Sequence, residues 1–303
     1  DRMESFARQY PLARFYRSYV ELLRDSEVDA VALATPAEQH ASMAIAALRA
    51  GKDVFVEKPM ALTLESGQEI LEASSATRRL VMVGHLLLYH PAIEAIQQLL
   101  GSGELGRLEY IYSNRLSMGK IRSEENAWWS FAPHDISVIL RLVGHSPVQV
   151  SATGGAYLQP NIADVTVSDL LFNHGTRAHI FVSWLHPYKE QRLVVIGSKK
   201  TVVFEETRPT AKLLVYDNRI ARIGDRLEAA QSQPSVQQYS TEEPLRLECQ
   251  HFADCVRTRQ SPRTPAEDGL RVLEVLQACQ RSLQLNGELV QMSSRAFQRV
   301  VAI

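Results

Sequence analysis

The sequence predicts an α/β protein in which a Rossmann-type parallel sheet precedes an α+β region with a large, mostly antiparallel open sheet. Three observations carry this prediction. Strands and helices alternate over residues 29–85, five extended runs follow one another over residues 148–206, and two helical segments close the chain. Alternation is typical of right-handed βαβ units around a parallel sheet. Consecutive extended runs joined by turn residues are typical of antiparallel hairpins.

The first region, which we expect to be a domain over residues 1–90, contains three short apolar runs that predict buried parallel strands. These strands are Asp29–Ala34, Asp53–Lys58 and Arg79–His85. The segments between and after them predict helices, because each begins or ends at a characteristic capping residue. The helices are Glu38–Ala50, which ends at Gly51, then Thr63–Ala76, and then Pro91–Leu100, which opens the next region.

The second region, expected over residues 91–303, predicts a sheet accompanied by helices. Its extended runs are Arg107–Leu116, Val148–Leu158, Asp164–Phe172, Arg177–Leu185, Arg192–Ser198 and Thr201–Glu206. Its expected helices are Pro133–Val143, Leu245–Arg257 and Ala266–Leu285. The polar, Gln/Ser-rich stretch Arg222–Thr241 contains Pro234 and indicates a surface excursion.

The composition excludes several classes of protein. The 303 residues include 33 Lys plus Arg and 34 Asp plus Glu, and the resulting net charge of −1 argues against an electrostatic nucleic-acid binder. A hydrophobic fraction of 45% excludes bulk disorder. No apolar run is long enough to predict a membrane span, and three cysteines indicate no disulfide framework. We therefore expect a cytoplasmic protein that binds neither nucleic acid nor a membrane; the resemblance described below adds a small-molecule partner.

Three familiar motifs are absent or misplaced. Gly101–Gly106 reads GSGELG and matches G-x-G-x-x-G, but a helix precedes it and a strand follows. A dinucleotide loop needs the reverse order, so these glycines indicate a helix end and a turn into a strand. The histidines and cysteines lack metal-ligand spacing, and no G-x-S-x-G elbow occurs, so we expect neither a metal site nor a serine hydrolase.

Two strand ends carry polar residues where open α/β sheets bind ligands, at their carboxyl edge. Thr35, Pro36 and His40 follow the first strand, and Glu57-Lys58-Pro59 ends the second. A lysine in such a partly dry position can titrate near neutral pH. The alternatives are a helix cap at Pro36 and a solvated surface ion pair at Glu57 and Lys58.

The second region offers two further candidates. His134 and Asp135 begin the helix that we expect from Pro133, where a histidine suits acid–base chemistry. Asp135 could instead serve only to favour the helix N-terminus. His186 follows Trp184 at the end of a strand, where the alternative is a packed aromatic residue beside an edge turn.

Taken together, these pieces resemble the glucose–fructose oxidoreductase/inositol dehydrogenase/MocA (Gfo/Idh/MocA) family. The residues that carry the resemblance are ATPAEQH (34–40), VEKPMALT (56–63), SGELGRL (102–108) and APHD (132–135), in that order. The resemblance covers essentially the whole chain. It implies an oxidoreductase with NAD or NADP as cofactor, and a homo-oligomer formed through the open sheet.

The resemblance also implies roles for individual residues. Lys58 matches the catalytic Lys of the EKP motif, and His134 matches the catalytic His of the second domain. Thr35, Pro36, His40 and Glu57 match positions near the nicotinamide ribose, beside Lys58 and Pro59. The run 115–140 is similar to the nucleotide-sugar 3-dehydrogenase branch. Arg115, Lys120 and Arg122 would suit an anionic sugar nucleotide there, and Arg115, Arg122, Asp135 and His186 are its expected substrate-binding residues.

Two departures from the family pattern matter. Ser130 stands where many members have an Asp, which leaves Lys58 and His134 to share the proton-transfer role. The family also begins with a strand–GxGxxG–helix–strand unit, to which nothing here corresponds. We therefore expect the first βαβ unit to be missing, and this chain alone to bind dinucleotide weakly or not at all. The sequence predicts hydride transfer to or from a sugar or nucleotide sugar. The alternative is a truncated, non-catalytic homologue that binds sugar or oligomerises.

Overall fold

The computed structural model describes residues 2–119, 121–217, 219–223, 225–230 and 233–292. The chain divides into two compact units. The first comprises residues 1–84 and 251–266, and the second comprises residues 85–250 and 267–303. The sequence places a single boundary after residue 90, whereas the first unit ends at Gly84 and takes back a later segment.

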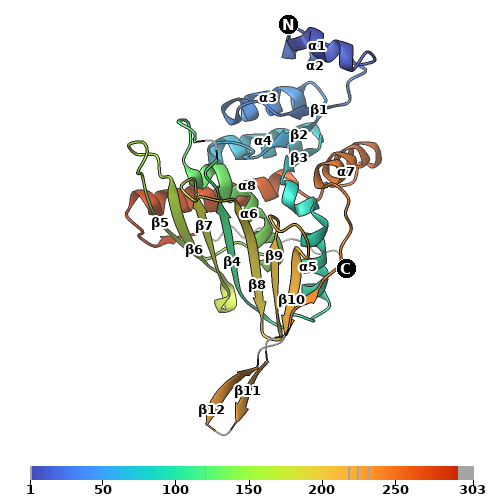
Figure 1. Ribbon diagram of the computed structural model, residues 1–303. Helices are drawn as coiled ribbons and strands as arrows, with labels where there is room; N and C mark the ends of the chain where they lie inside the picture. The colour runs from blue at the N-terminus through green and yellow to red at the C-terminus, as the bar shows by residue number, and fades with distance from the viewer. Residues whose placement is uncertain (1, 120, 218, 224, 231–232, 293–303) are drawn as a thin grey trace. The chain divides into compact units, whose positions relative to one another are not determined.

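The first unit contains a parallel three-stranded sheet in the order β1-β2-β3. Its strands are β1 (Ala30–Leu33), β2 (Asp53–Glu57) and β3 (Val81–Gly84), and its connecting helices are α3 (Ala37–Arg49) and α4 (Leu64–Thr77). Helices α1 (Arg2–Gln9) and α2 (Tyr19–Arg24) precede them, as Figure 1 shows. The three strands and two connecting helices confirm the predicted ones to within a few residues. Strands β2 and β3 are buried apart from the half-buried Glu57, whereas β1 alternates, with Val31 and Leu33 buried and Ala32 exposed.

The later segment joins the first unit through specific contacts. The Val83 amide donates to the Thr264 carbonyl (2.8 Å), and the Thr264 hydroxyl donates to the Val83 carbonyl (2.7 Å). Arg259 forms an ion pair with Asp53, whose side chain is 1% exposed. Contacts between residues so far apart in sequence leave no local pattern of residues. The sequence therefore does not predict that residues 251–266 join the first unit.

The second unit is built on a nine-stranded sheet with the order β13-β10-β9-β8-β4-β7-β6-β5-β14. The strands are β4 (Leu108–Leu116), β5 (Gln149–Gly155), β6 (Val165–Leu171), β7 (Arg177–Ser183), β8 (Glu190–Gly197), β9 (Lys200–Glu205), β10 (Leu213–Asp217), β13 (Ser235–Val236) and β14 (Val290–Gln291). All neighbours pair antiparallel except β4 and β7, which pair parallel. This confirms the predicted large, mostly antiparallel sheet.

Helices cover one face of this sheet. They are η1 (Leu86–Tyr89), α5 (Pro91–Gly101), α6 (Ala127–Val143) and α8 (Ala266–Gln284); Figure 1 shows α6 and α8 behind the strands. The fully buried Trp128 indole on α6 donates to the Leu276 carbonyl on α8 (3.1 Å). Helix α7 (Pro244–Thr258) runs from the second unit into the first. None of the helices in the described part of the chain is long and apolar enough to cross a membrane.

The glycine-rich stretch after α5 confirms its interpretation as a turn. Helix α5 ends at Gly101, and Gly106 has φ +74° just before β4 begins. A Cβ atom added to Gly106 would lie 2.3 Å from the Ser198 hydroxyl oxygen, so a larger residue would be strained in both backbone and space.

Two parts of the second unit differ from the predicted elements. At the start of the expected surface excursion (222–241), and beginning three residues before it, the structure forms a separate two-stranded hairpin, β11 (Arg219–Ile223) and β12 (Arg226–Ala230). Helix α6 begins at Ala127 and not at Pro133, which lies inside it. The reason is the cap: the Asn126 side chain accepts a hydrogen bond from the Trp129 amide (3.1 Å). His134 therefore lies in mid-helix, not in a first turn.

We predict that Asn126→Ala lowers the free energy of unfolding of the second unit by about 1–2 kcal/mol, because the cap is lost. Asn126→Asp should lose less, since it keeps the acceptor for Trp129 and gives up only the amide bond to Gln280 (2.8 Å). All three tryptophans lie in this unit, so urea unfolding followed by their fluorescence makes the measurement. Equal stability of both variants with the unaltered protein would contradict the assigned cap.

Candidate active site

The carboxyl edge of the small parallel sheet gathers the first set of predicted residues. Leu33 pairs with Val56, and Glu57 pairs with Gly84. Because these strands run parallel, the segments that follow β1 and β2 leave the sheet at the same edge. Thr35 and Lys58 each lie two residues beyond the paired positions Leu33 and Val56. The sheet register therefore brings the two predicted turns side by side.

The first turn leads directly into α3. Pro36 is the N-cap of this helix, and its carbonyl accepts from the Gln39 amide (2.9 Å). The Thr35 hydroxyl lies 3.6 Å from the Met43 sulfur. The capping alternative for Pro36 is thus realised, and it places the start of α3 next to the strand end, where helix N-termini favour negative charge.

The second turn holds Lys58 between two fixed neighbours. The Glu57 carboxylate accepts a hydrogen bond from the backbone amide of Lys58 (3.3 Å). The peptide bond between Lys58 and Pro59 is cis. Glu57 and Lys58 are both half-buried, whereas the neighbouring Val56 and Pro59 are buried.

His40 links the two turns. Its Nδ1 lies 2.8 Å from the Pro59 carbonyl oxygen, and its Nε2 lies 2.9 Å from the Thr35 carbonyl oxygen. The residue is 1% exposed. Both polar atoms of the ring are thus engaged with backbone.

The second unit holds the other predicted catalytic residue. His134 is half-buried on α6, and its carbonyl accepts from the Ser137 hydroxyl (2.8 Å). Ser130 lies one helical turn earlier and is 8% exposed. Because residues four apart share a helix face, Ser130 and His134 point in a similar direction.

Asp135 and Arg115, two of the predicted substrate-binding residues, contact each other. The Arg115 guanidinium donates to both oxygens of Asp135 (2.8 and 3.2 Å), and the Ser113 hydroxyl donates to Oδ1 (2.6 Å). Only 12% of the Arg115 side chain and 5% of the Asp135 side chain are exposed. This ion pair ties α6 to β4 and fixes the helix position next to His134.

The remaining predicted substrate-binding residues contact other groups. Arg122 lies 3.1 Å from Glu125 and 3.5 Å from Glu124, so its charge is compensated locally. The His186 Nδ1 lies 2.9 Å from the Tyr188 carbonyl oxygen, and the two rings meet edge to face. Lys120 lies outside the described residues.

Two hollows flank α6 within the second unit. One is lined by Arg115, Asp135, Gln191, Arg192 and Glu206 among apolar side chains. Burial raises the pKa of the Glu206 carboxyl, but hydrogen bonding to His90 and the Lys212 charge lower it by more, so the net shift is downward. A carboxylate at the rim of this hollow therefore stays charged at neutral pH.

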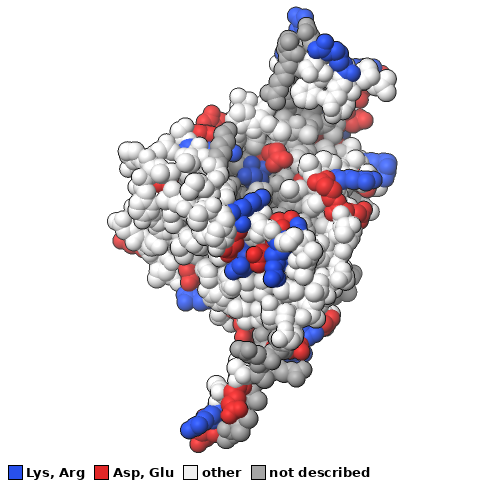
Figure 2. All heavy atoms as spheres, viewed as in Figure 1, with Lys and Arg blue, Asp and Glu red and all other residues white. Residues whose placement is uncertain are grey.

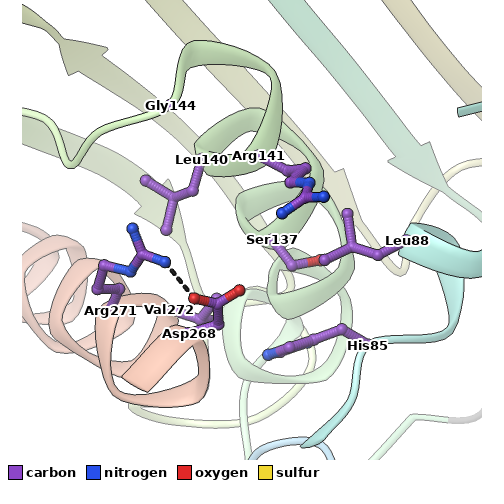
Figure 3. A pocket seen from close by; sticks show the side chains of 9 residues that line it. All are labelled: His85, Leu88, Ser137, Leu140, Arg141, Gly144, Asp268, Arg271 and Val272. Carbon is purple, nitrogen blue, oxygen red and sulfur yellow. Dashed lines mark hydrogen bonds and ion pairs between the residues drawn. The ribbon is translucent and has the colours of Figure 1, made fainter. Parts of the chain in front are cut away.

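The other hollow lies between α6, α8 and η1 and has an empty volume of about 380 Å³, open solvent included. Figure 3 shows Asp268 bound to Arg271 in its wall, with Arg141, Ser137 and His85 around it. The Asp268 carboxylate already offsets the Arg271 charge. In the parts of the chain that the structure describes, no group of three or more His, Cys, Asp or Glu side chains could hold a metal ion.

Comparison with known proteins places these features in a family. Residues 1–85 match the family model GFO_IDH_MocA, described as an oxidoreductase family with an NAD-binding Rossmann fold. Residues 93–203 match the GFO/IDH/MocA C-terminal domain. Together these matches cover most of both units.

Individual relatives agree. A scyllo-inositol 2-dehydrogenase (NAD(+)) from Bacillus subtilis is 26% identical over 98% of this chain and 87% of its own length. A UDP-N-acetylglucosamine 3-dehydrogenase from Acidithiobacillus ferrooxidans is 31% identical over 52% of this chain and 49% of its own. The solved structure of that dehydrogenase superposes with a TM-score of 0.79 at 25% identity, covering 94% of this chain and 87% of the other.

We predict that Asp135→Ala lowers the free energy of unfolding of the second unit by roughly 3–5 kcal/mol, because it leaves the buried Arg115 charge uncompensated. The double variant Arg115→Leu with Asp135→Ala should cost clearly less than the sum of the single changes. Urea unfolding followed by tryptophan fluorescence measures all three variants. Strict additivity would show that the pair carries no coupling.

Proposed function

This chain belongs to the GFO/IDH/MocA family of NAD(P)-dependent oxidoreductases, and we propose that it transfers a hydride between the nicotinamide and a ring hydroxyl carbon of a sugar or nucleotide sugar. The observation that carries this proposal is the position of Lys58, directly after β2 at the carboxyl edge of the parallel sheet. Open α/β sheets bind their ligands at this edge. The named relatives are dehydrogenases, which favours a catalytic role over the non-catalytic alternative.

The residues at this edge fit a dinucleotide. Thr35 and Pro36 form one turn, while Glu57, Lys58 and Pro59 form the next, and His40 joins them. We propose that these turns hold the nicotinamide ribose, with NAD or NADP as cofactor. The bound dinucleotide supplies the hydride acceptor or donor.

Lys58 and His134 handle the proton of the substrate hydroxyl in this proposal. When hydride leaves a carbinol carbon, the hydroxyl proton must leave too, and a side chain near neutral titration is the suitable acceptor. Ser130 does not ionise, so the transfer rests on Lys58 and His134. The Glu57 carboxylate accepts from the Lys58 backbone amide, which restrains the main chain at this position.

For the substrate pocket we propose the end of β4 and the neighbouring part of α6. Arg115 and Asp135 lie there together, with Arg122 and His186 as further candidates. The Arg115 and Arg122 guanidiniums already contact the Asp135 and Glu125 carboxylates. An anionic sugar nucleotide would therefore share these arginines with the carboxylates or displace the carboxylates. The similarity to the UDP-N-acetylglucosamine 3-dehydrogenase supports a nucleotide sugar as the finer assignment.

We also propose that copies of the chain associate through the face of the large sheet opposite α6. Tyr110, Tyr112, His179 and Phe181 lie on that face, because they alternate with the buried Ile111, Ile180 and Val182. Figure 2 shows that charged side chains are sparse over β5 and β6, where Val167 is 44% exposed.

All three cysteines are free thiols, and we propose a cytoplasmic location.

We predict that Lys58→Met lowers kcat by about 10²- to 10⁴-fold, the usual contribution of a proton-transferring side chain. The assay is reduction of NAD⁺ or NADP⁺ with UDP-N-acetylglucosamine and scyllo-inositol as probes, using protein expressed from its complete reading frame. Lys199→Met is the matched control, because this exposed lysine belongs to the second unit, where its ammonium donates to the Gly103 carbonyl (3.4 Å). Unchanged turnover in Lys58→Met would remove the lysine from the mechanism.

We predict that association weakens as the pH falls below about 6.5, the ordinary value for histidine. Burial lowers the pKa of His179, so its ring is neutral above that value and accepts from the Tyr110 hydroxyl (2.6 Å). Burial, with the Asp169 charge, raises the pKa of Tyr110, so the phenol remains the donor. The hydrogen bond between Tyr110 and His179 is therefore intact above pH 6.5 and is lost as the pH falls through the lowered pKa of His179, which leaves a charged ring on the sheet face.

Sedimentation velocity at pH 7.5 and 5.5 measures this effect. His179→Phe should associate equally at both values, because it keeps a ring against Tyr112 without a titrating nitrogen. A monomer at both values in the unaltered protein would contradict the association itself.

A further inference from the structure

We infer that His40 is a positioning residue that holds the Lys58 turn in place through the Pro59 carbonyl and does not itself contact the dinucleotide. The inference rests on the proposed function, because it assumes that Lys58 acts on the substrate. It assigns to His40 a role distinct from the ribose contact that the family resemblance implies.

The burial of His40 leaves no polar atom for a ligand. The residue is 1% exposed, and both ring nitrogens lie within hydrogen-bond distance of backbone carbonyls. A contact with the cofactor would require the ring to move away from one of these two carbonyls. The side chain is therefore part of the protein interior.

The position of His40 on α3 explains how it reaches both carbonyls. Pro36 caps the helix and Ala37 begins it, so His40 lies in the first turn. Side chains of a helix lean toward its N-terminus, which here points back at the end of β1. The ring is thereby directed into the space between the two turns.

The His40 ring connects the two chain segments beyond the point where strand pairing ends. The last pair between β1 and β2 is Leu33 with Val56, and Thr35 and Pro59 lie beyond it. The His40 ring joins these two residues at 2.8 and 2.9 Å. Lys58 is thus held from both sides, by the Glu57 carboxylate at its own amide and by His40 at the following residue.

The two contacts of the His40 ring depend on which ring nitrogens carry a proton. A carbonyl oxygen only accepts, so each ring nitrogen must donate to make its bond. A neutral ring carries one N–H and can hold one turn, whereas a doubly protonated ring holds both. Positioning of Lys58 requires the proton on Nδ1, which faces Pro59.

The first test is the ¹⁵N NMR signature of the His40 ring in protein from the complete reading frame, at the pH of the assay. A proton on Nδ1, with or without a second on Nε2, supports the inference. A bare Nδ1 with the proton on Nε2 alone overturns it, because the Pro59 carbonyl then receives no bond.

The second test compares two substitutions that each keep one bond. An Asn amide nitrogen stands near the place of Nδ1 and keeps the bond to Pro59, and a Gln amide nitrogen stands near Nε2 and keeps the bond to Thr35. We expect His40→Gln to lower kcat by roughly 10- to 100-fold, the cost of a small misplacement. His40→Asn should lose several-fold less, and KM for NAD⁺ should change little in either.

Controls separate this role from simple stability and from failure of the proposed function. Ser42→Ala removes a hydrogen bond to Gln39 on the same helix (3.1 Å) and should leave kcat unchanged. If both His40 variants lose kcat equally and in step with thermal stability, the role is merely structural. If Lys58→Met is fully active, the proposed function fails instead. If Lys58→Met loses activity but His40→Gln keeps full activity, the proposed function stands and only the positioning role of His40 is overturned.

Discussion

Parallel pairing of β1 and β2 is the constraint on which the candidate site depends. Because Leu33 pairs with Val56, the chain leaves both strands at one edge, and two turns that are 23 residues apart in sequence become neighbours. Val31 and Leu33 of β1 are buried whereas Ala32 between them is exposed, so a slip of one residue would expose the two larger side chains and is disfavoured. Lys58 inherits its position from this register. The packing that stabilises the sheet therefore also fixes the edge at which we propose the chemistry.

In the second unit, a buried ion pair between Asp135 and Arg115 fixes the helix α6 against strand β4. Asp135 follows His134 on α6, and it accepts from Arg115 and Ser113 on β4. An isolated buried carboxylate would be costly, but three donated hydrogen bonds and a guanidinium charge offset that cost. Such a pair specifies one helix position more strictly than apolar packing does, because its geometry has few alternatives. His134 is the preceding residue on the helix that this pair fixes.

The sequence predicted local elements well and long-range pairings poorly. The strands around Val31, Val54 and Val83 carry dense apolar runs, so they could be read directly from the residues. The start of α6 was misplaced because Pro133 matches a helix start, while Asn126 supplies the actual cap and was the residue that could have revealed it. The Arg115–Asp135 pair could not be predicted, since a strand and a helix 20 residues apart leave no periodic trace of their contact. The same holds for the return of residues 251–266 to the first unit.

Titration of isotope-labelled protein from the complete reading frame with NAD⁺ tests most directly whether the turns after β1 and β2 hold the dinucleotide beside Lys58. Backbone amide NMR then reports each residue separately and needs no sugar substrate. The account predicts that the largest shift changes occur at Thr35, Ala37 and Lys58, while amides of the hollow beside Asp268 and Arg271 change little. The largest changes at that hollow, with the Thr35 and Lys58 amides unmoved, would contradict the account.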